Sequence, residues 1–169
     1  MAHCAACGTR LEAQPIHGRV REVCPACGTV RWENPIPAVG AVLVRDGRVL
    51  LCRRGGPPKE GGWDLPGGIM EVEEGPEDAL CREVHEEIGL ALERLRLIGV
   101  WPGRYDHRWS LNLIYVVEAQ GEPQARDDVA ATQWFPLDAL PELAWEHEAE
   151  ALRLLRAGGG PKTVGPTRR

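Results

Sequence analysis

Three glutamates near the middle of the chain, Glu83, Glu86 and Glu87, have the chemistry and the spacing of a site for a hard divalent cation. At about 100° per residue, a helix places all three on one face. Carboxylates crowded near the end of a helix repel one another, and the helix dipole disfavours each by roughly 0.3 to 1 kcal/mol. Bound Mg²⁺ or Mn²⁺ removes this conflict, because both ions prefer oxygen ligands. The alternative is a solvated, glutamate-rich helix face that binds nothing.

The segment that carries these glutamates has the start and stop signals of a helix over residues 76–88. Pro76 suits the first helical position, where no N–H is needed, and Gly89 is typical of a helix end. Apolar residues from Leu80 to Ile88 recur at helical spacing beside the glutamates. One face of the helix is therefore predicted to pack against a core, while its neighbour gathers the carboxylates.

A longer pattern surrounds this helix: G-x5-E-x7-R-E-V-x-E-E-x-G-L begins at Gly68 and ends at Leu90. The pattern fills all nine fixed positions of the Nudix box, and the chain resembles a Nudix hydrolase, an enzyme that cuts a diphosphate linked to another moiety. The resemblance implies that Mg²⁺ or Mn²⁺ is held by Glu83, Glu86, Glu87 and the carbonyl group of Gly68.

Arg82 has two interpretations. The resemblance implies that it orients the metal-binding glutamates, whereas its spacing from Asp78 and Glu86 also allows ordinary surface ion pairs. Glu71 and Glu74, just before the helix, match acidic positions that are common in this loop of the family. We therefore predict that both lie at the substrate site.

The general base stays open between two residues. Asp127 and Asp128 precede the last predicted strand, in a loop that in related enzymes reaches toward the metal cluster and sometimes carries the base. Asp128 stands where many relatives have glutamate. Glu86 competes for the role, because crowded carboxylates can raise one another's pKa toward neutrality. The predicted catalytic residues are Glu83, Glu86, Glu87, Arg82 and Asp128.

Two CxxCG motifs near the start of the chain, separated by sixteen residues, predict a four-cysteine zinc site. The ligands would be Cys4, Cys7, Cys24 and Cys27. A segment this short cannot fold by burial alone, so zinc would supply its folding energy. A thioredoxin-like redox pair is disfavoured by the matched second motif, and a disulfide framework by the expected cytosolic location. The ribbon is predicted to brace its neighbour or to form dimers.

Alternating apolar runs and turn signals predict the remaining elements. Strands are expected over residues 38–44, 48–52, 95–101, 111–118 and 131–135, and a second helix over residues 143–156. The expected fold class is α+β, and the Nudix resemblance implies an α/β/α sandwich with a mixed sheet. The predicted organisation is a zinc ribbon over residues 1–33, a Nudix domain over 34–157 and a disordered tail over 158–169.

Several basic and aromatic residues are candidates for substrate binding. Arg53 and Arg54 end a predicted strand, where they either solubilise the surface or contact a phosphate or ribose. The predicted loop between the strands expected over residues 95–101 and 111–118 contains Arg104 and Tyr105. Such a loop could hold a nucleobase by stacking and a diphosphate by charge, or be an ordinary exposed turn. Trp145 is assigned to the core.

The substrate is predicted from resemblance to one branch of the family. The ribbon followed by Asn34-Pro35, Val39-Gly40-Ala41 and Leu51-Cys52-Arg53-Arg54 resembles ADP-ribose and FAD pyrophosphatases. ADP-ribose is expected first and FAD second. NADH is an alternative, although the Ser-Gln-Pro-Trp array of that branch is missing. Dinucleoside polyphosphates, nucleoside triphosphates and a non-catalytic, nucleotide-sensing Nudix regulator are the others, but such regulators commonly lose box glutamates.

The whole chain limits the classes of partner. Its 169 residues carry a net charge of −5, which is unlike a general nucleic-acid binder and favours a small-molecule substrate. No apolar run is long enough to span a bilayer, and no leader pattern precedes the first cysteine, so a cytoplasmic location without membrane contact is expected. Homodimers are common in similar enzymes, so a homodimer is one candidate assembly, but no exposed apolar stripe in the sequence indicates one, and the oligomeric state stays open.

Overall fold

The computed structural model describes residues 2–158 and divides the chain into two compact units, Met1–Asn34 and the remainder from Pro35. Apart from Gly158, the predicted tail over residues 158–169 lies outside the described residues.

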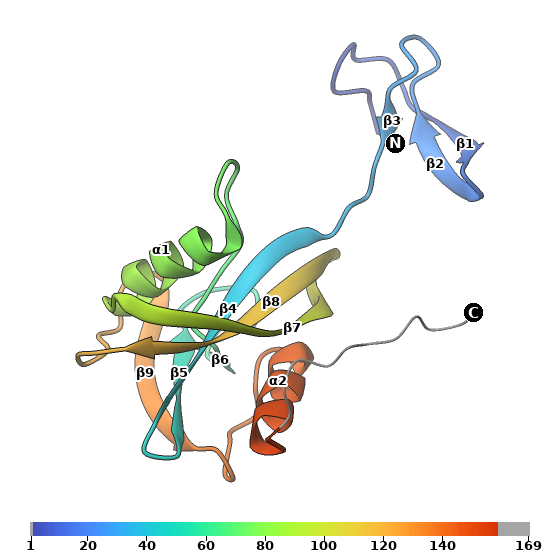
Figure 1. The fold of residues 1–169 in the computed structure, drawn as a ribbon. Helices are drawn as coiled ribbons and strands as arrows, with labels where there is room; N and C mark the ends of the chain where they lie inside the picture. The colour runs from blue at the N-terminus through green and yellow to red at the C-terminus, as the bar shows by residue number, and fades with distance from the viewer. Residues whose placement is uncertain (1, 159–169) are drawn as a thin grey trace. The chain divides into compact units, whose positions relative to one another are not determined.

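The first unit is a small antiparallel sheet flanked by two equivalent turns (Figure 1). Its strands are β1 (Glu12–Ile16), β2 (Arg19–Val23) and β3 (Val30–Arg31). In each CxxCG turn the glycine has a φ of 73°, and its N–H donates to the carbonyl oxygen of the motif's first cysteine. Only glycine adopts this left-handed conformation at little cost, so the motif itself shapes both turns.

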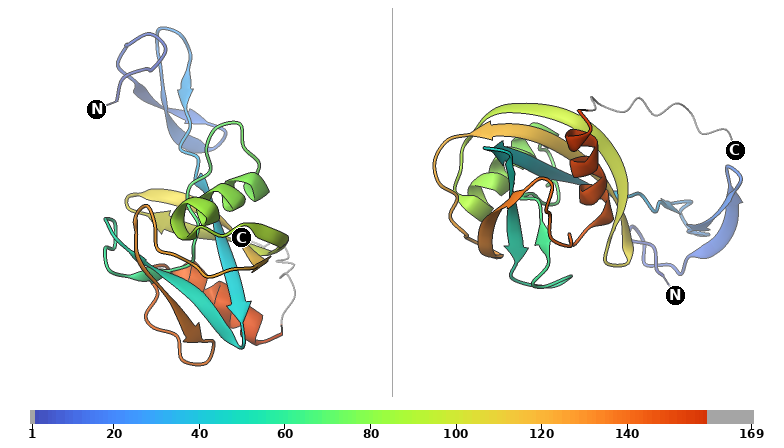
Figure 2. Two further views of the ribbon diagram at one scale, coloured as in Figure 1. Left: turned by 90° about the vertical axis from the view of Figure 1, so that its left-hand side faces the viewer. Right: turned by 90° about the horizontal axis from the view of Figure 1, so that it is seen from below.

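The second unit is built on a six-stranded mixed sheet. The strands are β4 (Ile36–Arg45), β5 (Arg48–Arg54), β6 (Trp63–Asp64), β7 (Leu92–Tyr105), β8 (Arg108–Ala119) and β9 (Val129–Pro136). The main path runs β6-β5-β4-β8-β7, and β9 pairs with β5. Strands β4 and β8 are parallel, and the other pairs are antiparallel. Helices α1 (Pro76–Ile88) and α2 (Glu146–Arg156) lie on opposite sides of the sheet (Figures 1 and 2), which confirms the predicted fold class.

Each helix covers its own hydrophobic core. Leu80 of α1 packs with residues of β4, β5 and β8 that include Ala41, whereas Leu152 of α2 packs with a separate set that includes Val42. Ala41 and Val42 are consecutive in β4, and successive strand residues point to opposite faces. The continuous apolar run of β4 is thus explained by burial of both its faces.

A gap in the strand pairing positions the loop over residues 66–68. Strands β4 and β5 pair at only two positions, next to their hairpin. Farther along, the N–H of Ala41 donates to the carbonyl of Pro66 at 2.8 Å, and the N–H of Val39 donates to that of Gly68 at 2.9 Å. The loop therefore pairs with the part of the β4 edge that β5 does not cover, and it places Gly68 next to α1.

Two predicted boundaries were wrong. The loop expected over residues 102–110 is instead the end of a long hairpin. Strands β7 and β8 pair as far as Tyr105 and Arg108, and the turn consists of Asp106 and His107. The second helix begins at Glu146 rather than residue 143, because its N-cap residue has an extended backbone. How far two strands continue to pair and where a helix is capped depend on contacts with other segments of the chain. A local sequence pattern does not contain this information.

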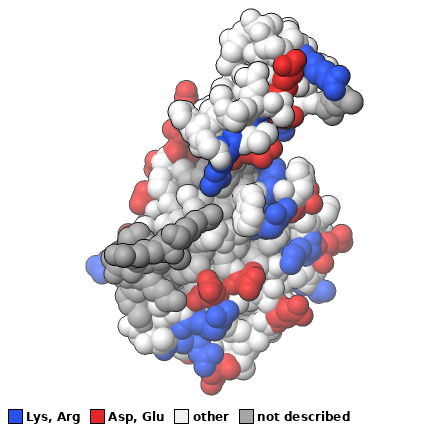
Figure 3. Space-filling model, turned by 90° about the vertical axis from the view of Figure 1, so that its right-hand side faces the viewer, with Lys and Arg blue, Asp and Glu red and all other residues white. Residues whose placement is uncertain are grey.

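Charges are interspersed on the face that Figure 3 shows, where neither basic nor acidic side chains cover a broad area. Within residues 2–158, no helix combines the length and the apolar character needed to cross a membrane.

Candidate active site

Helix α1 presents its glutamates in three different environments. The helix spans the predicted residues, with Pro76 at its start and Gly89 in a left-handed conformation at its end, its N–H donating to the carbonyl of residue 85. Glu87 is buried, Glu83 is half-buried and Glu86 is exposed. Because burial penalises a carboxylate, the pKa of Glu83 is raised and that of Glu87 is raised to about 9.

Arg82 binds three glutamates. Its guanidinium donates to Glu74 at 2.7 and 3.1 Å, to Glu83 at 2.9 Å and to Glu86 at 3.1 Å. These hydrogen bonds lower the pKa of Glu74, which also accepts the backbone N–H of Glu71. Arg82 thereby ties the loop before α1 to two of the predicted metal ligands.

Two glycines allow the loop over residues 66–68 to approach α1. A Cβ on Gly67 would lie 2.2 Å from the carbonyl oxygen of Val39, and the φ of Gly67 is 147°. Its N–H donates to Glu87 at 2.8 Å. A Cβ on Gly68 would lie 2.5 Å from a carboxylate oxygen of Glu83. The backbone of Gly68 and the carboxylate of Glu83 are thus held side by side, with no space for a larger residue.

These groups line a cavity of about 260 Å³. The predicted site residues that line it are Gly68, Glu71, Glu83, Glu87, Asp128, Arg54, Arg104 and Tyr105. Four others lie outside the lining: Arg53, Glu74, Arg82 and Glu86. Arg53 is exposed and donates to the carbonyl of Gly61, so the structure does not bring it to the other candidates.

Further polar residues of the cavity were missed from the sequence: Asp64, Ser110, Asn112, His147 and Glu148. Trp145, assigned to the core, also lines the cavity, and its ring lies 5.6 Å from that of Tyr105. One signal was available, because two successive inward positions of a strand, Ser110 and Asn112, are polar where a core face should be apolar. The others come from a two-residue strand and from the first turn of α2, which have no distinctive pattern.

The cavity holds more acidic than basic groups. Asp64 bonds to Arg54 at 2.8 Å, yet burial still raises the pKa of Asp64 to about 6. Glu148, only 5% exposed, accepts the backbone N–H of Leu65 at 3.2 Å through one oxygen, and its other oxygen has no partner. Burial raises the pKa of Glu148 well above its usual value. The lining also contains the carboxyl groups of Glu83, Glu87 and Asp128, and its basic side chains are few in comparison.

This donor set fits a hard divalent cation. Mg²⁺ and Mn²⁺ bind carboxylate and carbonyl oxygens and keep several waters, so the ligand atoms of one site need not touch. Within residues 2–158, no group of three carboxylates brings its oxygens within 4.8 Å of one another. The carbonyl of Gly68 accepts one N–H and retains a second lone pair for an ion.

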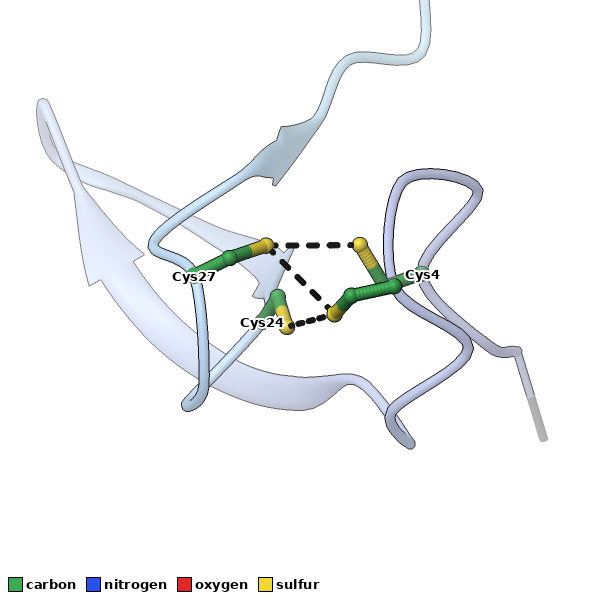
Figure 4. Close-up of side chains that lie close together, drawn as sticks. Cys4, Cys24 and Cys27 are labelled. Atoms are coloured by element: carbon green, nitrogen blue, oxygen red, sulfur yellow. Dashed lines mark hydrogen bonds between the residues drawn. The ribbon is translucent and has the colours of Figure 1, made fainter.

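The four cysteines of the first unit form a tighter cluster (Figure 4). Their sulfur atoms all lie within 4.8 Å, and the Cys4–Cys27, Cys7–Cys24 and Cys7–Cys27 separations are 3.6, 3.5 and 3.6 Å. A tetrahedron with Zn–S bonds of about 2.3 Å has edges of about 3.8 Å, so the arrangement fits a zinc ion.

The chain resembles known proteins over both units. A protein-family model described as NUDIX domain matches residues 34–156. ADP-ribose pyrophosphatase of Methanocaldococcus jannaschii is 35% identical over 118 residues, which cover 68% of this chain and 70% of that protein. NAD-capped RNA hydrolase NudC of Pseudomonas aeruginosa is 34% identical over 173 residues, covering 96% of this chain but only 59% of that protein. The crystal structure of a NUDIX hydrolase from Nitrosomonas europaea shares the fold, with a TM-score of 0.80, 24% identity and 98% of each chain covered.

Proposed function

Because this chain belongs to the Nudix hydrolase family, we propose that it is a metal-dependent pyrophosphatase that cleaves the diphosphate bond of ADP-ribose, to AMP and ribose 5-phosphate, or of FAD. The observation that carries the proposal is the contact of Gly68 with Glu83 at the wall of an acidic cavity, with Arg82 bonded to Glu83 behind it.

Glu83, Glu86, Glu87 and the carbonyl of Gly68 are the proposed ligands of Mg²⁺ or Mn²⁺. When bound, such an ion neutralises charge on the diphosphate and makes a water molecule more acidic. Arg82 holds Glu83 and Glu86 in place through hydrogen bonds. The cysteine cluster is proposed as a structural zinc site that stabilises the first unit.

Asp128 is the better candidate for the general base. It lines the cavity, whereas Glu86 lies outside the lining and bonds to Arg82. In the proposed step, a water oxygen forms a bond to one phosphorus, the bridging P–O bond breaks, and the proton of the water passes to Asp128. A base must lie within reach of the proton that it removes, and only Asp128 of the two borders the space where substrate would lie.

The balance of charge favours a diphosphate that joins two uncharged groups. Arg54 and Arg104 are the basic residues of the cavity lining, and the charge of Arg54 is opposed by Asp64. The further phosphates of a nucleoside triphosphate would meet carboxylates with little cationic compensation. Tyr105 and Trp145 add aromatic surface for a neutral sugar or base.

An AMP-release screen tests this function. Purified protein is incubated with Mg²⁺ or Mn²⁺ and with ADP-ribose, FAD, NADH, dinucleoside polyphosphates and nucleoside triphosphates in turn. We expect ADP-ribose to give the highest kcat/KM, and Asp128→Asn to reduce it by about 10²- to 10⁴-fold. Glu86→Gln and Glu87→Gln should each reduce it as well. Full turnover by both glutamate variants in saturating Mg²⁺ would contradict the proposed metal site.

A second candidate is a pyridine dinucleotide or an RNA that carries one. It is favoured by the NudC relative, whose match covers 96% of this chain and so includes most of the first unit. NADH is therefore a comparison substrate of the screen, and NAD-capped RNA is tested beside it by release of nicotinamide mononucleotide. A higher kcat/KM for either would replace ADP-ribose. Protein that binds nucleotides but releases no product from any of them would instead be a regulator.

A further inference from the structure

Three neutral polar side chains gather at the β8–α2 side of the cavity. Ser110 and Asn112 lie on the same face of β8 and are only 3% and 6% exposed, and His147 comes from the first turn of α2. We refer to these three residues as the polar cluster. All three line the same cavity as Gly68 and Glu83. Burying a polar group costs free energy unless its hydrogen bonds are satisfied. The presence of these three side chains on an inward face therefore needs an explanation.

The hydrogen bonds of Asn112 define the orientation of its amide. Its Nδ2 donates to the carbonyl of Trp101 at 3.2 Å and to Oγ of Ser110 at 3.0 Å. A backbone carbonyl only accepts, so the nitrogen must point toward Trp101 and the oxygen elsewhere. The Oδ1 of Asn112 is then a fixed acceptor. Because Oγ of Ser110 accepts from Asn112, its own proton is left to donate.

Gly103 of β7 allows the cluster to close. A Cβ at this position would lie 2.5 Å from Nδ2 of Asn112, 2.8 Å from Nδ1 of His147 and 3.0 Å from Oγ of Ser110. The three polar atoms therefore converge on one point. Burial lowers the pKa of His147 to about 4, so its ring is neutral near pH 7 and has one donor and one acceptor.

The cluster offers acceptors and donors without charge, and this pattern selects a ligand chemistry. Phosphate oxygens only accept, so they would be repelled by Oδ1 of Asn112. Hydroxyl groups both donate and accept, and two adjacent hydroxyls match an adjacent acceptor and donor. A cavity of about 260 Å³ suits a compact sugar better than a whole nucleoside, since sites for drug-sized ligands occupy about 300 to 1,000 Å³.

We propose that Ser110, Asn112 and His147 bind the adjacent hydroxyls of the ribose at the non-adenosine end of the substrate and so determine specificity for it. The proposal rests on the proposed function, because it assumes that a nucleoside diphosphate derivative occupies the cavity. It adds that the enzyme recognises the terminal sugar itself rather than accepting any group joined to the diphosphate.

The test measures binding without turnover. Calorimetry with Mg²⁺ compares α,β-methylene ADP-ribose, which cannot be cleaved at its bridging position, with α,β-methylene ADP, which lacks the terminal ribose. Wild-type protein should bind the first analogue more tightly. Asn112→Ala and Ser110→Ala should each weaken its binding by about 3- to 10-fold, the value of a hydrogen bond or two, and leave binding of the second analogue unchanged. Leu111→Ala, on the opposite and more exposed face of β8, is the matched control and should change neither.

The outcomes separate this proposal from the proposed function. Equal weakening of both analogues by the two variants would mean that the cluster supports the fold or binds the adenosine half, and would overturn the proposal. Equal affinity of wild-type protein for the two analogues would overturn it as well. If wild-type protein shows the expected preference but releases no AMP from ADP-ribose, the ribose site stands and the proposed catalysis fails.

Discussion

In the first unit, four sulfur atoms lie within 4.8 Å of one another, whereas in the second the glutamates of α1 are divided among Arg82, Gly67 and the cavity. The sulfur cluster has the dimensions of a complete zinc shell. The carboxylates leave room for waters and for substrate, as Mg²⁺ sites do. The difference supports the proposal that the first site serves folding and the second serves catalysis.

The two sites also differ in how they are assembled. Each pair of cysteines comes from one tight turn that its own glycine shapes. The acidic site requires α1, the loop over residues 66–68 and the turn before β9 to meet. Substitutions in the first unit should therefore act on folding, and those in the second on both packing and catalysis.

Cys24→Ser should unfold the first unit, because a structural zinc contributes about 10 to 16 kcal/mol in such small folds. Amide resonances of residues 2–34 should collapse and bound zinc should be lost, while resonances from the second unit stay dispersed. Cys81→Ser, on a half-buried thiol of α1, is the control and should retain zinc. If the first unit stays folded after its zinc is removed, the proposal that this site serves folding is wrong.

Glu148→Ala should destabilise the second unit by about 3 kcal/mol, because it leaves a cavity and an unpaired N–H on Leu65. Burial raises the pKa of Glu148 well above its usual value and so favours its uncharged form. Glu148→Gln keeps an acceptor and the shape and should cost less than about 1 kcal/mol. Urea unfolding measures both, and equal destabilisation by the two variants would count against the hydrogen bond to Leu65 as the source of the cost.

Gly68→Ala should reduce kcat/KM for the best substrate by about 100-fold, or about 2.7 kcal/mol, because its Cβ would displace Glu83 by a distance that matters for catalysis. The melting temperature should change little, since Glu83 can move toward solvent. Gly56→Ala, where a Cβ meets nothing within 4 Å, is the control. Unchanged kinetics for Gly68→Ala would mean that the close contact of Gly68 with Glu83 is not required for catalysis.

Acid should weaken the β8–α2 side of the cavity through His147. Burial lowers the pKa of His147 to about 4 in the folded protein. Its imidazole therefore takes up a proton near pH 6.5 in the unfolded chain but only near pH 4 in the folded protein. This stabilisation is complete above about pH 6.5 and declines as the pH falls toward 4, by roughly 2 kcal/mol after allowance for partial exposure. Urea unfolding from pH 7.5 to 4.5 should show a steeper loss for wild-type protein than for His147→Gln. His85→Gln, at an exposed residue, should follow the wild type.

Prediction from sequence was most successful for elements with strong local signals. The bounds of α1 were predicted correctly, because Pro76 and Gly89 mark its ends chemically. Strands β4, β5, β7, β8 and β9 were predicted in order, but β6 and the strands of the first unit were not, and β7 and β8 are longer than expected. Their outer halves contain charged and aromatic residues, and these positions are strand because the partner's backbone groups pair with them.

The residues predicted at the site and found in the cavity lining come from the box and from four positions outside it: Arg54, Arg104, Tyr105 and Asp128. The contact of Gly68 with Glu83 joins two positions of that pattern, and the spacing indicated both. Arg53 and Arg54 are adjacent and looked equivalent, but only Arg54 lines the cavity. Neighbours on a strand point to opposite faces, and which face borders the cavity depends on the sheet that forms around it.

Spacings within a few residues are enough to predict the two sets of candidate ligands, soft thiolates in paired turns and hard carboxylates on one helix face. In contrast, tertiary packing determines which carboxylates share the cavity and brings Ser110, Asn112 and His147 together beneath Gly103. These contacts arise where β4 and β5 separate and where α2 packs on the sheet. They join segments that are far apart in the sequence, so no sequence periodicity predicts them.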